Sequence, residues 1–176
     1  MSHLRYASVP AGRAFAFSDA GRKRIEDLLA RYPTKQAALL PVLWLAQEEL
    51  GWISREAVEV VAGVLGLSPA YVDGVLTFYT MYHLKPVGKF HLQFCTSISC
   101  HLNGGEDVLE HCRRKLGVAG DETSPDGLFS IEEVECIAGC DRAPSMQVND
   151  QYREPMTPEK LDAMLAELSR GGDRGV

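Results

Sequence analysis

The sequence contains no long run of apolar residues. No stretch of its 176 residues approaches the roughly 18 consecutive apolar positions that a membrane-spanning helix requires. A secretory signal is also missing, because Pro10 and Gly12 interrupt the apolar core that such a signal needs. We therefore expect a cytoplasmic protein without direct membrane insertion. In that compartment lasting disulfides are rare and metal ligation by cysteine is common.

Nucleotide-binding and catalytic patterns are missing as well. Neither of the glycine-rich phosphate loops, G-x-G-x-x-G and G-x-x-x-x-G-K-S/T, occurs in the chain. The five histidines form no spaced pair, and no Ser-His-Asp or Cys-His set can be assembled. These absences predict a chain without a complete active site of its own, so any hydride chemistry would belong to another subunit.

In the second half of the chain, acidic residues outnumber basic residues. Residues 1–88 hold nine Lys and Arg against eight Asp and Glu, whereas residues 89–176 hold nine against sixteen, a net charge of −7. Such a surface repels phosphate backbones, which disfavours nucleic acid as a partner. It suits a protein partner with a basic face, although a merely solvated surface explains it equally well.

Residues 19–85 are predicted to form a helical bundle. Ser18 and Ser68 are suited to cap two helices, a third helix is expected to start near Ser54, and Pro41 fits the first turn of another. Gly51 is placed to end that helix. The apolar positions recur at helical spacing, and they are Ile25, Leu28, Leu29, Tyr32, Val42, Leu43, Ala46, Leu50, Val58, Val61, Val64, Leu65, Val72, Val75 and Leu76.

Residues 86–170 predict a second domain of α/β class, between tails at residues 1–18 and 171–176. Strands are expected from Phe90 to Cys95, at Phe129 and Ile131, and at Met146 and Val148, with a hairpin turn at Asn149-Asp150. Helices are expected after Asn103-Gly104-Gly105 and after Thr157-Pro158. A break in the alternation at Glu132-Glu133 predicts a bulge or an early strand end. The order of elements is compatible with a thioredoxin-like layer of sheet and helices.

Four of the five cysteines fall in two close pairs, Cys95-x4-Cys100 and Cys136-x3-Cys140. Four thiolates select zinc or an iron-sulfur cluster over hard cations, and this spacing is acceptable for either. A 2Fe-2S cluster takes two thiolates on each of two irons, so two separate pairs suit it. The fifth cysteine, Cys112, shares a helix face with apolar residues and is predicted to be buried rather than a ligand.

Several motifs, in one order along the chain, resemble a single family. They are Gln47–Ile53 (QEELGWI), Gly74–Tyr79 (GVLTFY), Gly88–Leu92 (GKFHL), Asp126–Ser130 (DGLFS), Val134–Pro144 (VECIAGCDRAP) and Gln147–Asn149 (QVN). From about residue 25 to 168 the chain resembles the small 2Fe-2S subunit of the NADH-oxidising module of respiratory complex I, the NADH:quinone oxidoreductase.

The resemblance implies an N-terminal helical bundle followed by a thioredoxin-like 2Fe-2S ferredoxin domain. It implies that Cys95, Cys100, Cys136 and Cys140 ligate the cluster, and that the chain is an electron-transfer subunit of that enzyme. The implied partner is the large subunit that binds FMN and NADH, beside other peripheral-arm subunits, so the chain would lie on the inner face of the membrane only through its partners. One departure is Ala138, where the family usually has glycine.

Three alternatives remain open from the sequence. The same module serves NAD-linked hydrogenases and formate dehydrogenases as a diaphorase subunit. Zinc could fill the same four thiolates in an interaction module. A thiol-disulfide oxidoreductase would share the thioredoxin-like layout, but the expected Cys-x-x-Cys at a helix start is missing.

Overall fold

A computed structural model describes residues 15–171 of the chain. These residues form two compact units, one up to Pro86 and one from Val87 onward. Most of the two predicted tails, residues 1–14 and 172–176, lies outside the described residues. Each unit has its own buried apolar core and is described by itself.

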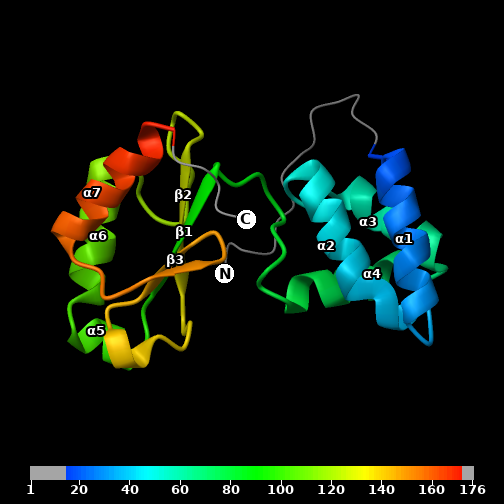
Figure 1. Ribbon diagram of the computed structural model, residues 1–176, viewed down its shortest axis with the longest axis horizontal. Helices are drawn as coiled ribbons and strands as arrows, with labels where there is room; N and C mark the ends of the chain where they lie inside the picture. Colours follow the sequence, from blue (N-terminus) through cyan, green and yellow to red (C-terminus); the bar gives the residue numbers. More distant parts are fainter. Residues whose placement is uncertain (1–14, 172–176) are drawn as a thin grey trace. The chain divides into compact units, whose positions relative to one another are not determined.

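The first unit consists of helices, as predicted (Figure 1). Ser18, Ser54 and Ser68 each accept a hydrogen bond from a first-turn backbone N–H, so the caps predicted at Ser18 and Ser68 and the helix start predicted near Ser54 are confirmed. Gly51 ends the second α-helix in the left-handed conformation. The elements are α1 (Asp19–Arg31), the 3-10 helix η1 (Gln36–Ala38), α2 (Leu39–Leu50), α3 (Arg55–Leu65) and α4 (Pro69–Phe78).

The apolar stripes of these helices meet in one core. Val42, Leu43, Val61 and Val72 are fully buried there. Phe17, from the segment assigned to the N-terminal tail, is buried in the same core. Within residues 15–171, no single helix is long and apolar enough to cross a membrane; α3 and α4 pass that test only as a pair, bent by 117° at their junction.

The second unit is a four-stranded mixed sheet with helices. Its elements are β1 (Phe90–Cys95), α5 (Ile98–Leu102), α6 (Gly105–Leu116), β2 (Phe129–Val134), the 3-10 helix η2 (Cys140–Arg142), β3 (Met146–Val148), β4 (Gln151–Arg153) and α7 (Pro158–Ser169). The strand order is β2-β1-β3-β4, with β1 parallel to β2 and antiparallel to β3. The predicted strands, hairpin turn and two helices are confirmed, whereas the short helix α5 was not predicted.

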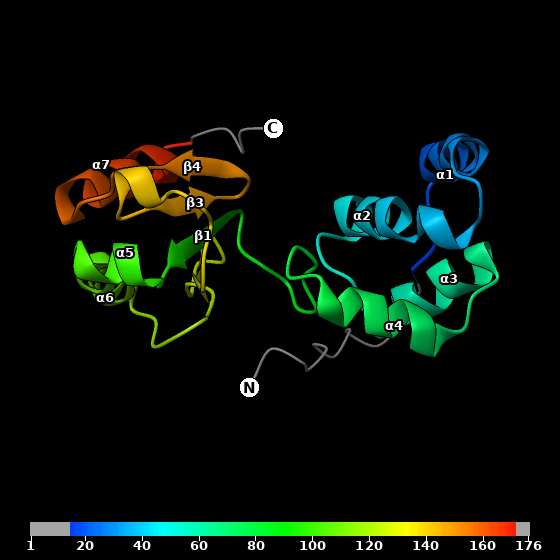
Figure 2. The same cartoon turned by 90° about the horizontal axis from the view of Figure 1, so that it is seen from below.

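Central β1 has the apolar character of a strand with neighbours on both sides. Phe90, Leu92 and Phe94 are buried in a core that includes residues of α6 and α7. Both helices lie on the same side of the sheet (Figures 1 and 2). β1 ends at Cys95, so the packing of this core fixes where the first predicted ligand is presented.

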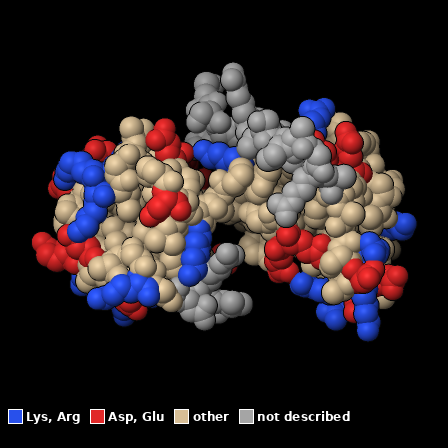
Figure 3. Space-filling view, turned by 90° about the horizontal axis from the view of Figure 1, so that it is seen from above, with Lys and Arg blue, Asp and Glu red and all other residues tan. Residues whose placement is uncertain are grey.

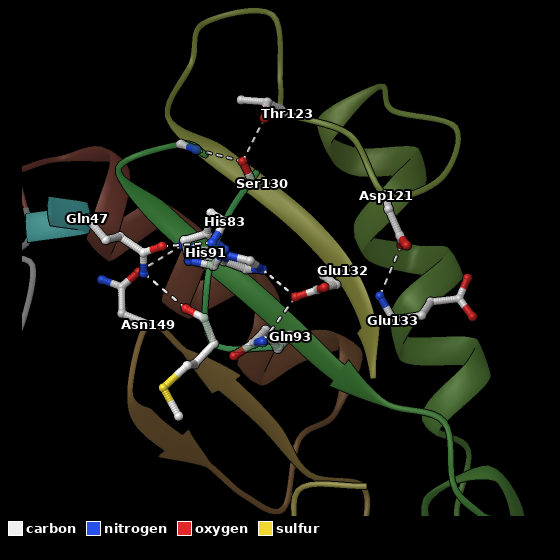
Figure 4. Close-up of polar contacts among 12 residues, drawn as sticks. Gln47, His83, His91, Gln93, Asp121, Thr123, Ser130, Glu132, Glu133 and Asn149 are labelled. Carbon is white, nitrogen blue, oxygen red and sulfur yellow. Dashed lines mark hydrogen bonds and ion pairs between the residues drawn. The ribbon is translucent and has the colours of Figure 1, made fainter. Parts of the chain in front are cut away.

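The predicted irregularity at Glu132-Glu133 is wrong. β2 pairs with β1 residue for residue from Phe129 to Val134, without a bulge. The alternation is lost at Glu133, which lies on the same face of β2 as Phe129 and Ile131 but is charged. Its carboxylate pairs with Arg113 of α6, so an ion pair takes the place of apolar packing at this position of an edge strand. On the opposite face, the Glu132 carboxylate contacts His91 Nε2 at 2.9 Å (Figure 4).

Charges of both signs are interspersed on the face drawn in Figure 3. Lys and Arg side chains there alternate with Asp and Glu rather than gathering into one basic patch.

Candidate metal centre

The first cysteine pair is buried and adjacent. Cys95 is the last residue of β1 and Cys100 lies in α5, and the two thiols are close enough to affect each other's protonation. Both side chains are almost completely buried. The backbone N–H of Ser145 donates to Cys100 Sγ at 3.4 Å, and the N–H of Cys95 donates to the Ser145 carbonyl at 3.2 Å. The backbone of Ser145 is therefore hydrogen-bonded to both cysteines of this pair.

Helix α5 is what brings Cys100 back beside Cys95. Ser97 occupies its N-cap position, but its hydroxyl donates to the Glu135 carbonyl instead of capping the helix. The helix ends before Gly104, which has a φ of 86°, and α6 starts at once with Gly105. A residue with a side chain is disfavoured at that φ, so the glycine pair allows the sharp turn.

The second cysteine pair lies on the loop that follows β2. Cys136 and Cys140 are both exposed, and Cys140 opens η2. In Figures 1 and 2 the turn that carries η2 lies beside α5 at one end of the sheet. The structure thus places both pairs at the same end of the second unit, one pair buried and one facing solvent.

Three alternate carbonyls of this loop accept hydrogen bonds from hydroxyl groups of three separate segments. Glu135 O accepts from Ser97, Ile137 O accepts from Tyr152 of β4, and Gly139 O accepts from Ser145 Oγ at 2.5 Å. These three hydrogen bonds direct the carbonyl oxygens to one side of the loop. Backbone N–H groups can then face the cysteine sulfur atoms on the other side. One of them does so, because Ala138 N–H donates to Cys136 Sγ at 3.4 Å.

Ala138 adopts a conformation that suits glycine. Its φ is 62°, in the left-handed region, which costs an alanine about 1–2 kcal/mol. This is the position at which the family usually has glycine, so the departure noticed in the sequence coincides with local backbone strain. The following Gly139 is buried with no room for a side chain, since a Cβ there would lie 2.8 Å from Ser145 Cβ.

The protonation of the thiols follows from burial. Burial raises the pKa of the Cys100 thiol, and the hydrogen bond from the Ser145 amide opposes this increase. Burial also raises the pKa of Cys112, to about 12. Cys112 lies in the apolar core of the second unit, so its predicted burial is confirmed.

The donor set consists of four sulfur atoms in two pairs, and this chemistry fits a 2Fe-2S cluster. A tetrahedral zinc site needs all four thiolates around one centre, whereas a 2Fe-2S cluster needs only two on each iron. All five cysteines are free thiols, so no disulfide competes for these side chains.

Sequence reasoning missed the residues that position the second pair. Tyr152, Ser145 and Glu154 carry no motif of their own, and their roles follow from contacts across 6 to 15 residues of chain. The one available signal was the unusual alanine at position 138, because a family glycine usually marks a special φ.

A mixed sheet with helices on one side and two cysteine pairs at one end defines this unit as a thioredoxin-like ferredoxin. The family model described as thioredoxin-like [2Fe-2S] ferredoxin matches residues 25–169, and the chain belongs to this family. The resemblance drawn from the sequence, its fold and its class of cofactor are therefore confirmed. No comparison tests the four ligand assignments, which stay a prediction.

Curated relatives cover nearly the whole chain. An NADH-quinone oxidoreductase subunit of Rickettsia bellii is 42% identical over 88% of this chain and 94% of its own length. The corresponding protein of Rhizobium meliloti is 42% identical over 87% of this chain and 90% of its own. NADH-quinone oxidoreductase subunit 2 of Thermus thermophilus is 42% identical over 88% of this chain and 87% of its own length. The predicted assignment to an oxidoreductase subunit is thereby confirmed.

A solved structure shares the fold. A chain of NAD+-reducing [NiFe]-hydrogenase in the H2-reduced state has a TM-score of 0.68 to this chain at 17% identity, over 77% of this chain. This chain spans only 22% of that longer one. At such low identity the likeness shows the fold alone.

Proposed function

We propose that Cys95, Cys100, Cys136 and Cys140 hold a 2Fe-2S cluster, and that the chain exchanges single electrons with the FMN of a larger, NADH-binding partner subunit of an NADH:quinone oxidoreductase. The observation that carries this proposal is the placement of both cysteine pairs at one end of the sheet, with a backbone N–H directed at Cys100 Sγ and another at Cys136 Sγ. When bound, the cluster supplies a one-electron redox couple.

The residues of this chain hold and tune the site rather than transform a substrate. The N–H groups of Ser145 and Ala138 stabilise negative charge on the sulfur atoms that they contact. Burial of Cys95 and Cys100 keeps water from one side, while exposed Cys136 and Cys140 leave the other side open to a partner. Hydride transfer is assigned to the partner, because a flavin accepts a hydride and passes electrons on.

An apolar surface borders the proposed site. Ile98 and Leu102 are 74% and 75% exposed and lie four residues apart on α5, on either side of Cys100. Residues at this spacing share one helix face. Exposed large apolar side chains next to a redox site favour docking of a protein partner there. Through such partners the chain would lie at the inner face of the membrane, in the cytoplasm, as a peripheral subunit.

Anaerobic purification of the full chain tests the cluster. We expect a reddish-brown protein with two irons and two sulfides per chain, and an S = 1/2 EPR signal after dithionite reduction. Cys95→Ala and Cys136→Ala should abolish the signal, and Cys112→Ala should retain it. A colourless protein with stoichiometric zinc would instead establish the interaction module, and loss of the signal in Cys112→Ala would overturn the ligand assignment.

A second candidate is the diaphorase subunit of an NAD-linked hydrogenase, since a chain of such an enzyme shares this fold. Isolation of the native assembly separates the two. Quinone-linked and membrane subunits would accompany the chain in an NADH:quinone oxidoreductase, and a nickel-iron subunit would accompany it in a hydrogenase.

A further inference from the structure

The peptide unit between Ile137 and Ala138 is engaged at both of its polar ends. Its carbonyl accepts a hydrogen bond from the Tyr152 hydroxyl, and its N–H donates to Cys136 Sγ at 3.4 Å. A peptide bond is planar, so the carbonyl and the N–H point in opposite directions and turn together. Whatever orients the carbonyl of Ile137 therefore also orients the N–H that faces Cys136.

The orientation of this peptide is not the one that Ala138 prefers. Rotation of the Ile137–Ala138 peptide about the chain changes φ of Ala138, which is 62° here. An alanine is more stable at negative φ. The flipped peptide would thus relieve backbone strain while turning its carbonyl oxygen toward the sulfur, so an external contact is needed to favour the observed orientation.

Tyr152 supplies that contact from outside the loop. It lies on β4, an edge strand, is 47% exposed, and reaches the loop through its hydroxyl. The hydroxyl is therefore the part of Tyr152 that bears on the cysteine loop.

We propose that Tyr152 is a positioning residue that holds the Ile137–Ala138 peptide with its N–H on Cys136 Sγ and thereby raises the reduction potential of the cluster. This inference rests on the proposed function. An N–H directed at a ligand sulfur stabilises the extra negative charge of the reduced state, and hydrogen bonds to sulfur set cluster potentials. A carbonyl oxygen in its place would destabilise that charge and lower the potential.

The test is a redox titration of the full-length, cluster-loaded chain, followed by EPR. Tyr152→Phe, which removes only the hydroxyl, should shift the midpoint potential to a more negative value. Tyr71→Phe is the matched control, because Tyr71 is also exposed and its hydroxyl contacts Gln36 in the first unit. It should leave the potential unchanged, and equal potentials for the two variants would overturn the proposal.

A double-variant cycle separates positioning from a general structural effect. Glycine at position 138 removes the preference for the flipped peptide, so Tyr152→Phe should shift the potential less in an Ala138→Gly background than in the wild type. A purely structural role of Tyr152 predicts the same shift in both backgrounds, and that result would contradict the proposal.

The outcome stays decisive if Tyr152→Phe takes up no cluster. In the cluster-free chains, the amide proton of Ala138 should exchange with solvent faster in Tyr152→Phe than in the wild type, and equal rates would refute the positioning role. If the wild-type chain itself contains neither iron nor sulfide, the proposed function fails, and the exchange rates still decide whether Tyr152 orients the peptide.

Discussion

Gly105, the first residue of α6, lies so close to Cys100 that a Cβ atom at position 105 would stand 2.8 Å from the Cys100 carbonyl oxygen. No real Cβ atom tolerates such an approach to backbone, so one of the two helices would have to move. The start of α6 and the position of a proposed ligand in α5 are thus set by a single close contact.

Gly105→Ala is expected to destabilise the chain by roughly 1–3 kcal/mol, because overpacking against backbone cannot be relieved by a side-chain rotation. Urea unfolding measures this loss, and iron content reports whether Cys100 is displaced. Gly74→Ala in α4 is the control, since none of the described atoms lies within 4 Å of a Cβ there beyond its own helix and chain neighbours. Glycine is unfavourable inside a helix, so this control should gain about 0.5–1 kcal/mol. Equal effects of both changes would contradict the close contact.

Ala138→Gly is expected to stabilise the chain by about 0.5–1 kcal/mol. The change relieves a left-handed alanine, and part of the gain is offset by the greater freedom of glycine in the unfolded chain. Ala166→Gly, on the exposed side of α7, is the same chemical change at a helical φ and should instead cost about 1 kcal/mol. Denaturant midpoints of the two variants should therefore move in opposite directions; movement in the same direction would show that position 138 is not strained.

Asp162 links α6 and α7 in a pH-dependent way. Its carboxylate contacts Lys115 Nζ and His111 Nε2, each at 2.8 Å, and the hydrogen bonds from Lys115 and then His111 lower the pKa of Asp162. A lowered folded-state pKa means that this stabilisation is present above about pH 4, the value in the unfolded chain, and is lost as the pH falls further.

Asp162→Asn should therefore make the free energy of unfolding fall less steeply between about pH 4 and pH 2 than it does in the wild type. Urea titrations across this range measure the slope. These side chains are partly exposed, so about 1 M salt should reduce the difference between the two proteins. Identical slopes at low salt would show that the ion pairs do not contribute.

Thiol reactivity should follow the exposure of the five cysteines. In the cluster-free chain, Cys136 and Cys140 are expected to react first with an alkylating reagent, because both are exposed. Cys112 should react last, because it is fully buried and its pKa is raised to about 12. Mass-spectrometric mapping over time gives the order, and early modification of Cys112 would contradict its place in the core.

Most of the fold could be predicted from local patterns. Serine caps at positions 18, 54 and 68, and the glycine at position 51, mark helix boundaries through contacts within one turn, and the structure places the boundaries there. The alternation of Phe90, Leu92 and Phe94 likewise predicts β1, because one face of the strand is buried in the core of the unit. Caps and apolar alternation can be recognised in the sequence because the residues that interact lie only a few positions apart.

The errors have an equally physical cause. The predicted break at Glu132-Glu133 assumed that a strand must alternate, but Glu133, on the face of Phe129 and Ile131, pairs with Arg113 of α6 while β2 continues. Helix α5 was missed because its five residues are too few to show a helical period, and the chain is turned there by the glycines that follow.

The sequence by itself determined the caps, the apolar periods, the two cysteine pairs and, through its motifs, the family, because each depends on residue identity and short spacing. Only the tertiary structure decided that one pair is buried and the other exposed, and that hydroxyls of Ser97, Tyr152 and Ser145 hold alternate carbonyls of the second cysteine loop. Hydrogen bonds between distant segments require the sheet to bring those segments together first, and no spacing along the chain encodes which hydroxyl will meet which carbonyl.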